Sequence, residues 1–167
     1  TNAQNFADWA EARFDFAGMS VAGCEIAGIH VLPIELSHPN NALGFKFSEG
    51  GKSFAFLTDN ELGFVHPGGK EFGDYVAFSR GVDLLVHDAD YTPAEYPRRR
   101  TWGHSTWEQA LDLGLKSEVR ALGLFHHNQD RYDSELDRIL AECARRIRRA
   151  GSKMKCFAVR EGQEVKL

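Results

Sequence analysis

The strongest constraint on the fold is an alternation of apolar and amphipathic segments in the second half of the chain. Apolar runs of strand length lie at 82–86, 119–125 and 154–159. Between them, segments with helical periodicity predict helices at about 106–115 and 134–150. Strands that alternate with helices usually pair in parallel, so the pattern predicts βαβ units whose strands end at one common edge of a sheet.

The first half of the chain predicts β-structure of another kind. A strand is expected at about 29–36 and ends at His38. Residues 43–58 are expected to form a hairpin, because apolar residues alternate on both sides of a Gly-Gly turn. A short helix is expected at about 70–79. We therefore predict a single α/β domain over residues 1–167, in which a β-hairpin precedes βαβαβ units.

Composition and charge exclude several classes of protein. A formal net charge of -4 at pH 7 gives no general attraction to nucleic acids or anionic membranes. No apolar run is long enough to span a membrane, and the first residues lack a signal-peptide pattern, so no membrane partner is expected. The cysteines, Cys24, Cys143 and Cys156, are odd in number and widely spaced, which favours a reducing cytoplasm. Homo-oligomerisation stays open at this point.

Residues that can bind metals follow the predicted strands. His38, His87 and the pair His126-His127 each come directly after a strand, as does Asp59. Because strand ends share one edge in α/β arrangements, we expect these side chains to share one site. Imidazole and carboxylate ligands suit zinc, manganese or iron, and a carboxylate such as that of Asp59 can bridge two ions. Composition does not choose among these metals.

His104 is a candidate of a different kind. It precedes a predicted helix whose start is indicated by Ser105 and Glu108, which have the spacing of a capping box. Free N–H groups and the positive end of the helix dipole suit an anion such as a phosphoryl oxygen at this position. They disfavour a charged imidazole unless a carboxylate compensates, and Asp88 is the candidate carboxylate.

Other polar groups have more ordinary interpretations. His30 alternates within a predicted strand and His66 lies in a His-Pro-Gly-Gly turn, so we leave both out of the site. The arginines of 145–149 lie away from the apolar stripe of the last helix and are interpreted as a solvated face. The run Arg98-Arg99-Arg100 suits a phosphate clamp, although a solvated basic turn is the favoured interpretation.

Three short motifs contain the candidate metal ligands: Leu36-Ser37-His38-Pro39 before Leu43-Gly44-Phe45-Lys46, then Phe56-Leu57-Thr58-Asp59, and Leu124-Phe125-His126-His127. Over about residues 25–140 they resemble the third, fourth and fifth metal motifs of the metallo-β-lactamase superfamily. The resemblance implies that His38, Asp59 and His126 are metal ligands and that Asp59 bridges two ions. His126 fits the fifth motif best, and His127 is the alternative.

Two further motifs resemble one branch of that superfamily, the ribonuclease Z-like and cyclic-phosphodiesterase-like enzymes. His87-Asp88-Ala89 is similar to the branch's His-Glu-Ala-Thr motif, and His104-Ser105-Thr106 matches its His-Ser-Thr motif. This resemblance implies phosphodiester chemistry in which His104 stabilises or protonates the leaving group and Asp88 orients it. Asp88 stands where ribonuclease Z has glutamate, so a shorter acid has to reach His104.

One signature of the superfamily is absent from the sequence. The His-x-His-x-Asp-His motif, which supplies most ligands of the first metal and the aspartate that activates water, occurs nowhere in the chain. The family's fold has this motif in its N-terminal half. The resemblance therefore implies the C-terminal half of a four-layered αββα metallo-β-lactamase fold, with the first half elsewhere.

The sequence leads to one main hypothesis and two alternatives. The hypothesis is a metal-dependent phosphodiesterase that, when intact, binds two divalent ions (Zn, Mn or Fe) and uses a metal-bound hydroxide as nucleophile. This chain alone is expected to be inactive. Its expected partners are a phosphodiester small molecule or nucleic-acid substrate and the missing N-terminal half. The alternatives are a non-catalytic binding or regulatory module with a degenerate metal site, and a thioester or lactone hydrolase of the same superfamily.

Overall fold

A mixed seven-stranded sheet organises the part of the chain that the computed structural model describes, residues 18–167. The strands are β1 (Cys24–Ile26), β2 (Ile29–Glu35), β3 (Leu43–Glu49), β4 (Lys52–Leu57), β5 (Leu84–Asp88), β6 (Ala121–Phe125) and β7 (Lys155–Ala158). Within these residues the helices are α2 (Phe72–Phe78), α3 (Trp107–Lys116) and α4 (Asp133–Arg149), with a 3₁₀ turn η1 (Tyr96–Arg98). The predicted α/β class is therefore confirmed.

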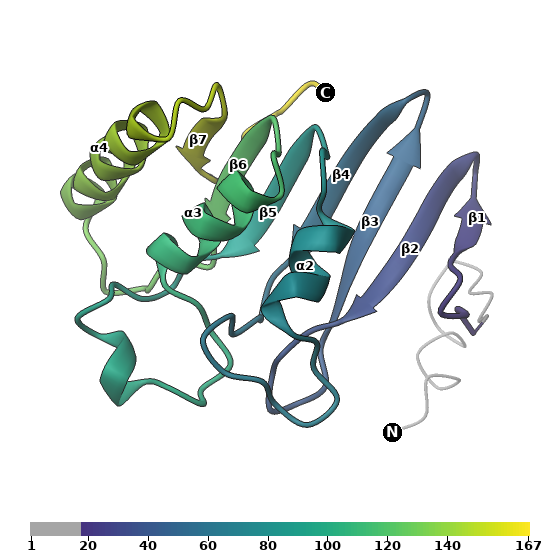
Figure 1. Ribbon diagram of the computed structural model, residues 1–167, viewed down its shortest axis with the longest axis horizontal. Helices are drawn as coiled ribbons and strands as arrows, with labels where there is room; N and C mark the ends of the chain where they lie inside the picture. The colour runs from purple at the N-terminus through teal and green to yellow at the C-terminus, as the bar shows by residue number, and fades with distance from the viewer. Residues whose placement is uncertain (1–17) are drawn as a thin grey trace, which may run out of the picture.

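The direction of the strands determines where the loops meet. The strands lie in chain order across the sheet; β1 to β4 pair antiparallel and β4 to β7 pair parallel. Because β3 reverses the chain and β4 reverses it again, β2 runs in the same direction as β4, β5, β6 and β7 (Figure 1). The carboxyl ends of β2, β4, β5 and β6 therefore open on one edge of the sheet.

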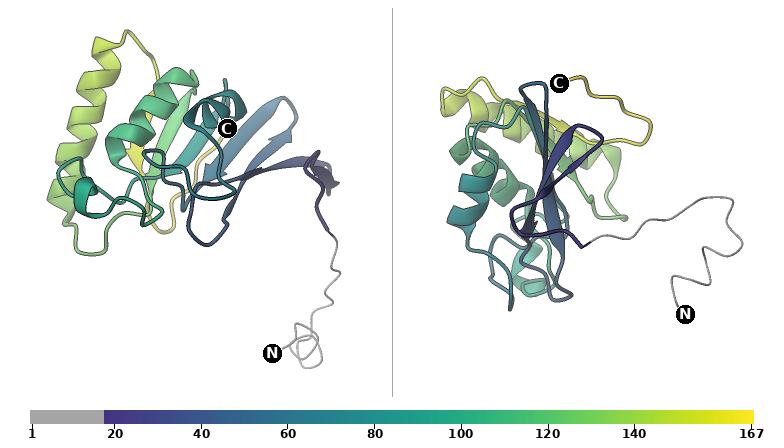
Figure 2. Two further views of the ribbon diagram at one scale, coloured as in Figure 1. Left: turned by 60° about the horizontal axis from the view of Figure 1, so that its bottom comes forward. Right: turned by 90° about the vertical axis from the view of Figure 1, so that its right-hand side faces the viewer.

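The three helices of residues 18–167 all pack on the same face of the sheet (Figures 1 and 2). Parallel strands that are added in one direction through right-handed crossovers place their helices in this way. The apolar core lies between the two layers and includes Leu57, Leu85, Leu122 and Leu124 from the sheet and Tyr75, Ala110, Leu113 and Cys143 from the helices. Within residues 18–167, none of the helices combines the length and the apolar character needed to cross a membrane.

The opposite face of the sheet carries a row of phenylalanine rings. Its members, which we call the aromatic face, are half-buried and adjacent ring centroids lie 5.7–6.3 Å apart: Phe45, Phe47, Phe54, Phe56 and Phe125. The alternate residues of β4, Ala55 and Leu57, are fully buried under the helices. No helix of the described residues covers the aromatic face, which is thus the second apolar surface of the sheet.

The predicted elements are present, but some of their ends differ from expectation. The strand expected at 82–86 is Leu84–Asp88, so the prediction that His87 follows a strand is wrong: it lies within β5. Polar residues broke the apolar pattern, although His87 and Asp88 are fully buried and pair with Leu124 and Phe125 of β6. The short strand β1 and the turn η1 were not predicted.

Candidate functional site

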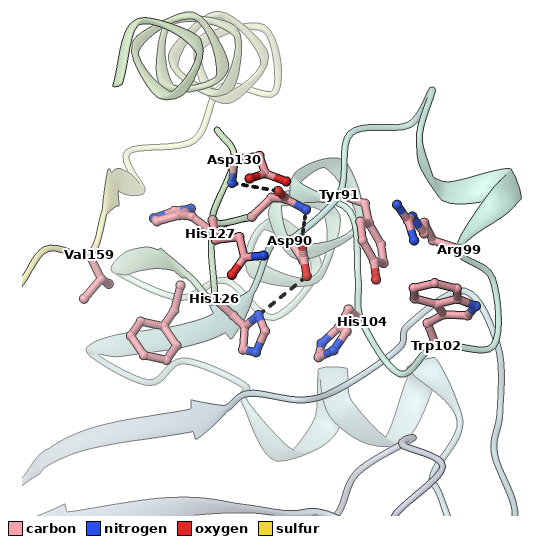
Figure 3. Close-up of a pocket in the computed structure, with 12 residues that line it drawn as sticks. Asp90, Tyr91, Arg99, Trp102, His104, His126, His127, Asp130 and Val159 are labelled. Atoms are coloured by element: carbon pink, nitrogen blue, oxygen red, sulfur yellow. Dashed lines mark hydrogen bonds and ion pairs between the residues drawn. The ribbon is translucent and has the colours of Figure 1, made fainter. Parts of the chain in front are cut away.

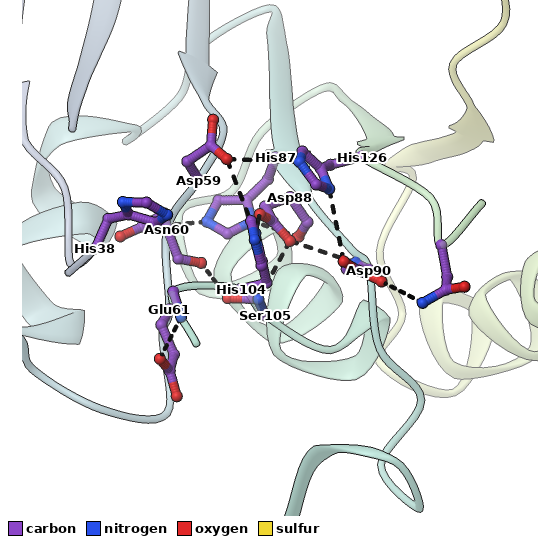
Figure 4. A network of polar contacts seen from close by, with 12 residues as sticks. His38, Asp59, Asn60, Glu61, His87, Asp88, Asp90, His104, Ser105 and His126 are labelled. Carbon is purple, nitrogen blue, oxygen red and sulfur yellow. Dashed lines mark hydrogen bonds and ion pairs between the residues drawn. The ribbon is translucent and has the colours of Figure 1, made fainter. Parts of the chain in front are cut away.

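The loops after β2, β4 and β6 bring His38, Asp59 and His126 together at one edge of the sheet (Figure 4). Asp59 lies between the two histidines. Its Oδ1 is 3.5 Å from Nε2 of His126, and its carboxylate lies within 4.8 Å of a ring nitrogen of His38. Three residues that are far apart in the sequence therefore point into one shared space.

Two of these residues adopt a backbone conformation that is uncommon for side chains other than glycine. Asp59 has φ of 59° and His126 has φ of 55°. Each follows the end of its strand closely, by two residues for Asp59 and one for His126. Such a conformation disfavours the folded state by about 1–2 kcal/mol per residue and is often found at functional sites.

Each imidazole holds one nitrogen on a protein partner and leaves the other for the shared space. Nδ1 of His126 lies 3.7 Å from Oδ2 of Asp90, so Nε2 faces Asp59. Nδ1 of His38 accepts a hydrogen bond of 3.2 Å from the backbone N–H of Asn40, which leaves Nε2. An acceptor such as the Asp90 carboxylate orients metal-binding histidines in proteins, whereas the Asn40 N–H beside His38 is a donor. With Nδ1 as acceptor, neutral His38 carries its proton on Nε2, so His38 could bind a metal ion through Nε2 only after this proton moves to Nδ1 and the hydrogen bond from Asn40 is lost.

The two histidines differ in charge when no metal is bound. The contact with Asp90 raises the pKa of His126 to about 9; burial opposes this increase, and Asp88 and Asp59 add to it. Burial lowers the pKa of His38, although Asp59 opposes it. His126 is therefore an imidazolium near neutral pH, and a metal ion has to release its proton before binding.

His104 is hydrogen-bonded to a buried carboxylate beside this cluster. Its Nδ1 donates to Oδ2 of Asp88 at 2.6 Å, and Oδ1 of Asp88 accepts from the backbone N–H of Ser105 at 3.2 Å. Burial alone would lower the pKa of His104, but the hydrogen bond and the charge of Asp88 outweigh it and raise the pKa. The His104 ring stacks on His126 with centroids 4.5 Å apart. The aspartate thus reaches His104 despite being shorter than a glutamate.

The start of α3 lies one residue later than the sequence indicated. Thr106 is the N-cap and accepts from the backbone N–H of Gln109 at 3.1 Å, so the predicted capping box with Glu108 is wrong. Ser105 has another role, because its Oγ donates to the backbone carbonyl of Asn60 at 2.6 Å. This bond ties the start of α3 to the loop after β4, and His104 lies two residues before the N-cap.

His87 is a buried structural bridge and does not face the shared space. Its Nε2 accepts from Nδ2 of Asn60 at 3.1 Å, and its Nδ1 donates to the backbone carbonyl of Asp88 at 2.7 Å. Oδ1 of Asn60 accepts from the backbone N–H of Ser37 at 2.9 Å, which fixes the orientation of the amide. Burial lowers the pKa of His87, so the neutral ring joins β5 to the loops after β2 and β4.

Glu61 is a buried carboxylate that sequence reasoning missed. Its Oε1 accepts from the Tyr96 hydroxyl at 2.7 Å and the Thr101 N–H at 2.8 Å. Its Oε2 accepts at 2.9 Å from Nε2 of His66 and from the backbone N–H of Gly103. His66, left out of the site, is thus buried beside it in a supporting contact. The segment before His104 is anchored through Glu61, and only its proximity to Asp59 in the sequence could have drawn attention to it.

An open cavity of about 750 Å³ lies beside His104 and His126 (Figure 3). His127 lines this cavity, and its Nε2 is buried without a hydrogen-bond partner among residues 18–167. His126, in contrast, faces Asp59. Asp90, also unforeseen from the sequence, lines the cavity and accepts from Nδ2 of Asn128 at 3.0 Å.

Comparisons with known proteins agree with this architecture. A family model described as the beta-lactamase superfamily domain matches residues 1–127. Ribonuclease Z of Exiguobacterium sibiricum is 31% identical over 147 residues, which cover 79% of this chain and 48% of the relative. The chain thus spans about half the length of this relative, and the matched stretch of ribonuclease Z from Picrophilus torridus is 22% of that protein.

Solved structures support the same fold. The metallo-beta-lactamase fold protein YhfI from Bacillus subtilis superimposes with a TM-score of 0.70 at 11% identity, covering 96% of this chain and 60% of YhfI. The short form of human tRNase Z gives a TM-score of 0.54 at 20% identity, covering 80% of this chain and 42% of the human protein. From the family match and the ribonuclease Z relatives, the chain belongs to the beta-lactamase superfamily, in its ribonuclease Z-like branch.

Proposed function

We propose that this chain carries part of the active site of a metal-dependent phosphodiesterase. The observation that carries the proposal is the hydrogen bond of 2.6 Å between His104 and the buried Asp88, next to the cluster of His38, Asp59 and His126. Membership of the superfamily supports a hydrolase, and the ribonuclease Z relatives support a phosphodiester as the bond that is broken.

The donor set fits divalent metals at two positions that share Asp59. One position lies beside His38 and the other beside His126, and nitrogen and carboxylate donors of this mixture suit zinc, manganese or iron. Within residues 18–167 each position draws two ligands, whereas catalytic sites use three or more, so further ligands would come from another segment. When bound, the ions would polarise the phosphoryl oxygens and activate water.

The first half of the fold is the proposed source of these ligands, and the aromatic face is its proposed contact. Half-buried rings on a sheet face suit a second sheet packed against them. The structural coverage agrees, because YhfI has 40% of its chain beyond the matched part. Residues 1–167 would then form one part of a larger domain.

His104 is proposed to act on the leaving oxygen. Asp88 occupies Nδ1 and raises the pKa of His104 against the effect of burial, so the ring holds a second proton, on Nε2, to a higher pH than an ordinary imidazole does. A positioned acid of this kind protonates an oxygen as its bond to phosphorus breaks. Asp88 is fully buried and keeps the ring in place.

A different role for His104 has support in the same geometry. Both groupings of potential metal ligands in residues 18–167 contain His104, one with His38 and Asp59 and one with Asp88 and His126. A carboxylate on Nδ1 also orients metal-binding histidines. The experiment therefore has to separate ligation from proton transfer.

Turnover of two substrates with different leaving groups distinguishes proton transfer from metal ligation. The measurement uses the protein that contains both halves of the fold. Without its acid, His104→Ala should lower turnover of a phosphodiester with an alkoxide leaving group by about 10²–10⁴-fold. Nitrophenolate leaves without a proton, so activity on a nitrophenyl diester should fall far less, and metal content should not change. His30→Ala, at an exposed position of β2, is the matched control. Equal losses on both substrates together with metal depletion would show that His104 is a ligand.

A further inference from the structure

Two cysteines that the site does not use lie on facing surfaces of α4 and β7. Cys143 is fully buried on the stripe of α4 that packs on the sheet. Cys156 pairs with Leu122 of β6, whose side chain is fully buried under the helices. Because paired residues of neighbouring strands point to the same face of a sheet, Cys156 points toward the helix layer, in which α4 lies beside β7 (Figure 1). The two thiols therefore meet at the helix–sheet interface.

The contact between the thiols changes the chemistry of the buried one. Both cysteines are free thiols in the structure. The hydrogen-bonding contact with the Cys156 thiol raises the pKa of Cys143 well above its ordinary value, and burial adds to this increase. Because the thiolate is the nucleophilic form of cysteine, Cys143 is unreactive by itself.

The two sulfur atoms also differ in their access to solvent. Cys143 has no exposed surface, whereas Cys156 is half-buried and lines an open cavity of about 370 Å³. Arg148, Lys153 and Lys155 line the same cavity, and within residues 18–167 no carboxylate does. Reactive cysteines typically lie in partly exposed, electropositive surroundings of this kind. A small oxidant therefore reaches Cys156 before Cys143.

We propose that Cys156 and Cys143 are a redox-sensitive pair that a peroxide converts into a reversible disulfide. The Cys156 sulfur attacks one oxygen of hydrogen peroxide, the O–O bond breaks and one water leaves, which gives a sulfenic acid. The Cys143 sulfur then attacks the Cys156 sulfur, and the S–O bond breaks. The hydroxyl group leaves with the proton of the Cys143 thiol as a second water. Two thiols thus give two electrons to the peroxide, and one S–S bond forms.

The disulfide would join two elements that border the site. The helix α4 follows the loop of His126 and His127, and Val159, directly after β7, lines the same cavity as His104. Closure of a short loop such as 143–156 stabilises a fold chiefly by restricting the unfolded chain, so oxidation should raise Tm by about 6–12 °C. The inference does not rest on the proposed function, because no metal, substrate or turnover enters it.

Peroxide treatment of the 167-residue chain tests the pair. A Cys24→Ser background removes the remaining thiol, which lies on β1 at the other end of the sheet. Catalase stops the reaction, and free thiols are counted with dithiobis(nitrobenzoic acid) in urea. We expect the count to fall from two to none, and the intact mass to fall by about 2 Da as two hydrogen atoms are lost. Dithiothreitol should restore the thiol count, the mass and Tm.

Two variants assign the roles of the cysteines. In Cys143→Ala, oxidation should stop at a sulfenic acid on Cys156, which dimedone traps, and Tm should not rise. In Cys156→Ser, Cys143 should stay reduced, because the oxidant does not reach a fully buried thiol. The mass and the thiol count are measured with both cysteines present, so the main result does not depend on the folding of either variant.

Three results would overturn the inference. The first is thiols that survive the peroxide treatment. The second is a gain of oxygen on Cys156, as sulfinic or sulfonic acid, without a cross-linked peptide that contains both cysteines. The third is a disulfide between two chains in place of one within the chain, which electrophoresis without reductant detects.

Discussion

Replacement of Glu61 by glutamine should destabilise the protein although the two side chains have nearly the same shape. The carboxylate is 1% exposed and accepts four hydrogen bonds, two on each oxygen. Glutamine replaces one oxygen by an NH₂ group. If NH₂ takes the place of Oε1, it faces the Thr101 N–H; if it takes the place of Oε2, it faces the Gly103 N–H. Tyr96 and His66 can reorient, but a backbone N–H cannot.

The size of this effect follows from the buried donor that is left without an acceptor. A buried unpaired group reduces stability by about 1–3 kcal/mol, and bonds to a charged acceptor contribute about 1.5–3 kcal/mol each. We expect Glu61→Gln to lower the free energy of unfolding by roughly 2–4 kcal/mol in total. At about 2–4 °C per kcal/mol for a chain of this size, Tm should fall by about 5–15 °C.

Urea and thermal denaturation followed by circular dichroism measure this loss. Glu49→Gln, at the exposed end of β3, removes the same charge without a buried network and should stay within about 0.5 kcal/mol of the wild type. A loss of that small size for Glu61→Gln itself would refute the reasoning, because the four short contacts would then contribute almost nothing.

Two further variants test other parts of the site. Burial lowers the pKa of His87, so on acidification the unfolded chain binds a proton at this histidine before the folded protein does. The stabilisation present above about pH 6.5 is therefore lost as the pH falls toward the lowered pKa. His87→Gln should flatten the decline of the urea midpoint between pH 7 and pH 5, and an unchanged slope would contradict this. Gly103 has φ of +95°, and a Cβ there would lie 2.2 Å from Cδ2 of His38, so Gly103→Ala should reduce Tm more than Gly81→Ala, where φ is +66° and the space is open. Equal losses would show that the close approach to His38 is unimportant.

The sequence predicted the edge at which the site forms because strand direction can be followed along the chain. The hairpin around Gly50 and Gly51 reverses the chain, so β4 runs in the same direction as β2. The residues that follow β2 and β4 therefore lie at the same edge of the sheet as those that follow β6. The positions of His38, Asp59 and His126 at one edge follow from this pattern of reversals and crossovers. Their catalytic and metal-binding roles stay predictions.

The supporting network could not be predicted in the same way. Glu61 and Asn60 follow Asp59 in a polar turn that resembles any solvated loop. Their burial depends on the segment around Thr101 and Gly103, about 40 residues later, which folds over them. His87 was misplaced for a related reason: apolar periodicity ends at the first polar residue, whereas strand pairing continues as long as a buried polar group finds partners.

The central claim is that two metal positions share Asp59 and that this chain supplies only part of the ligands of each. Isothermal titration calorimetry with zinc or manganese tests it most directly, with the 167-residue wild-type chain and its Asp59→Asn variant. Two ligands per position predict weak binding, and loss of the shared carboxylate should remove what binding there is at both positions together. Two tightly bound ions per chain with no other polypeptide present, or binding that Asp59→Asn leaves unchanged, would contradict the account.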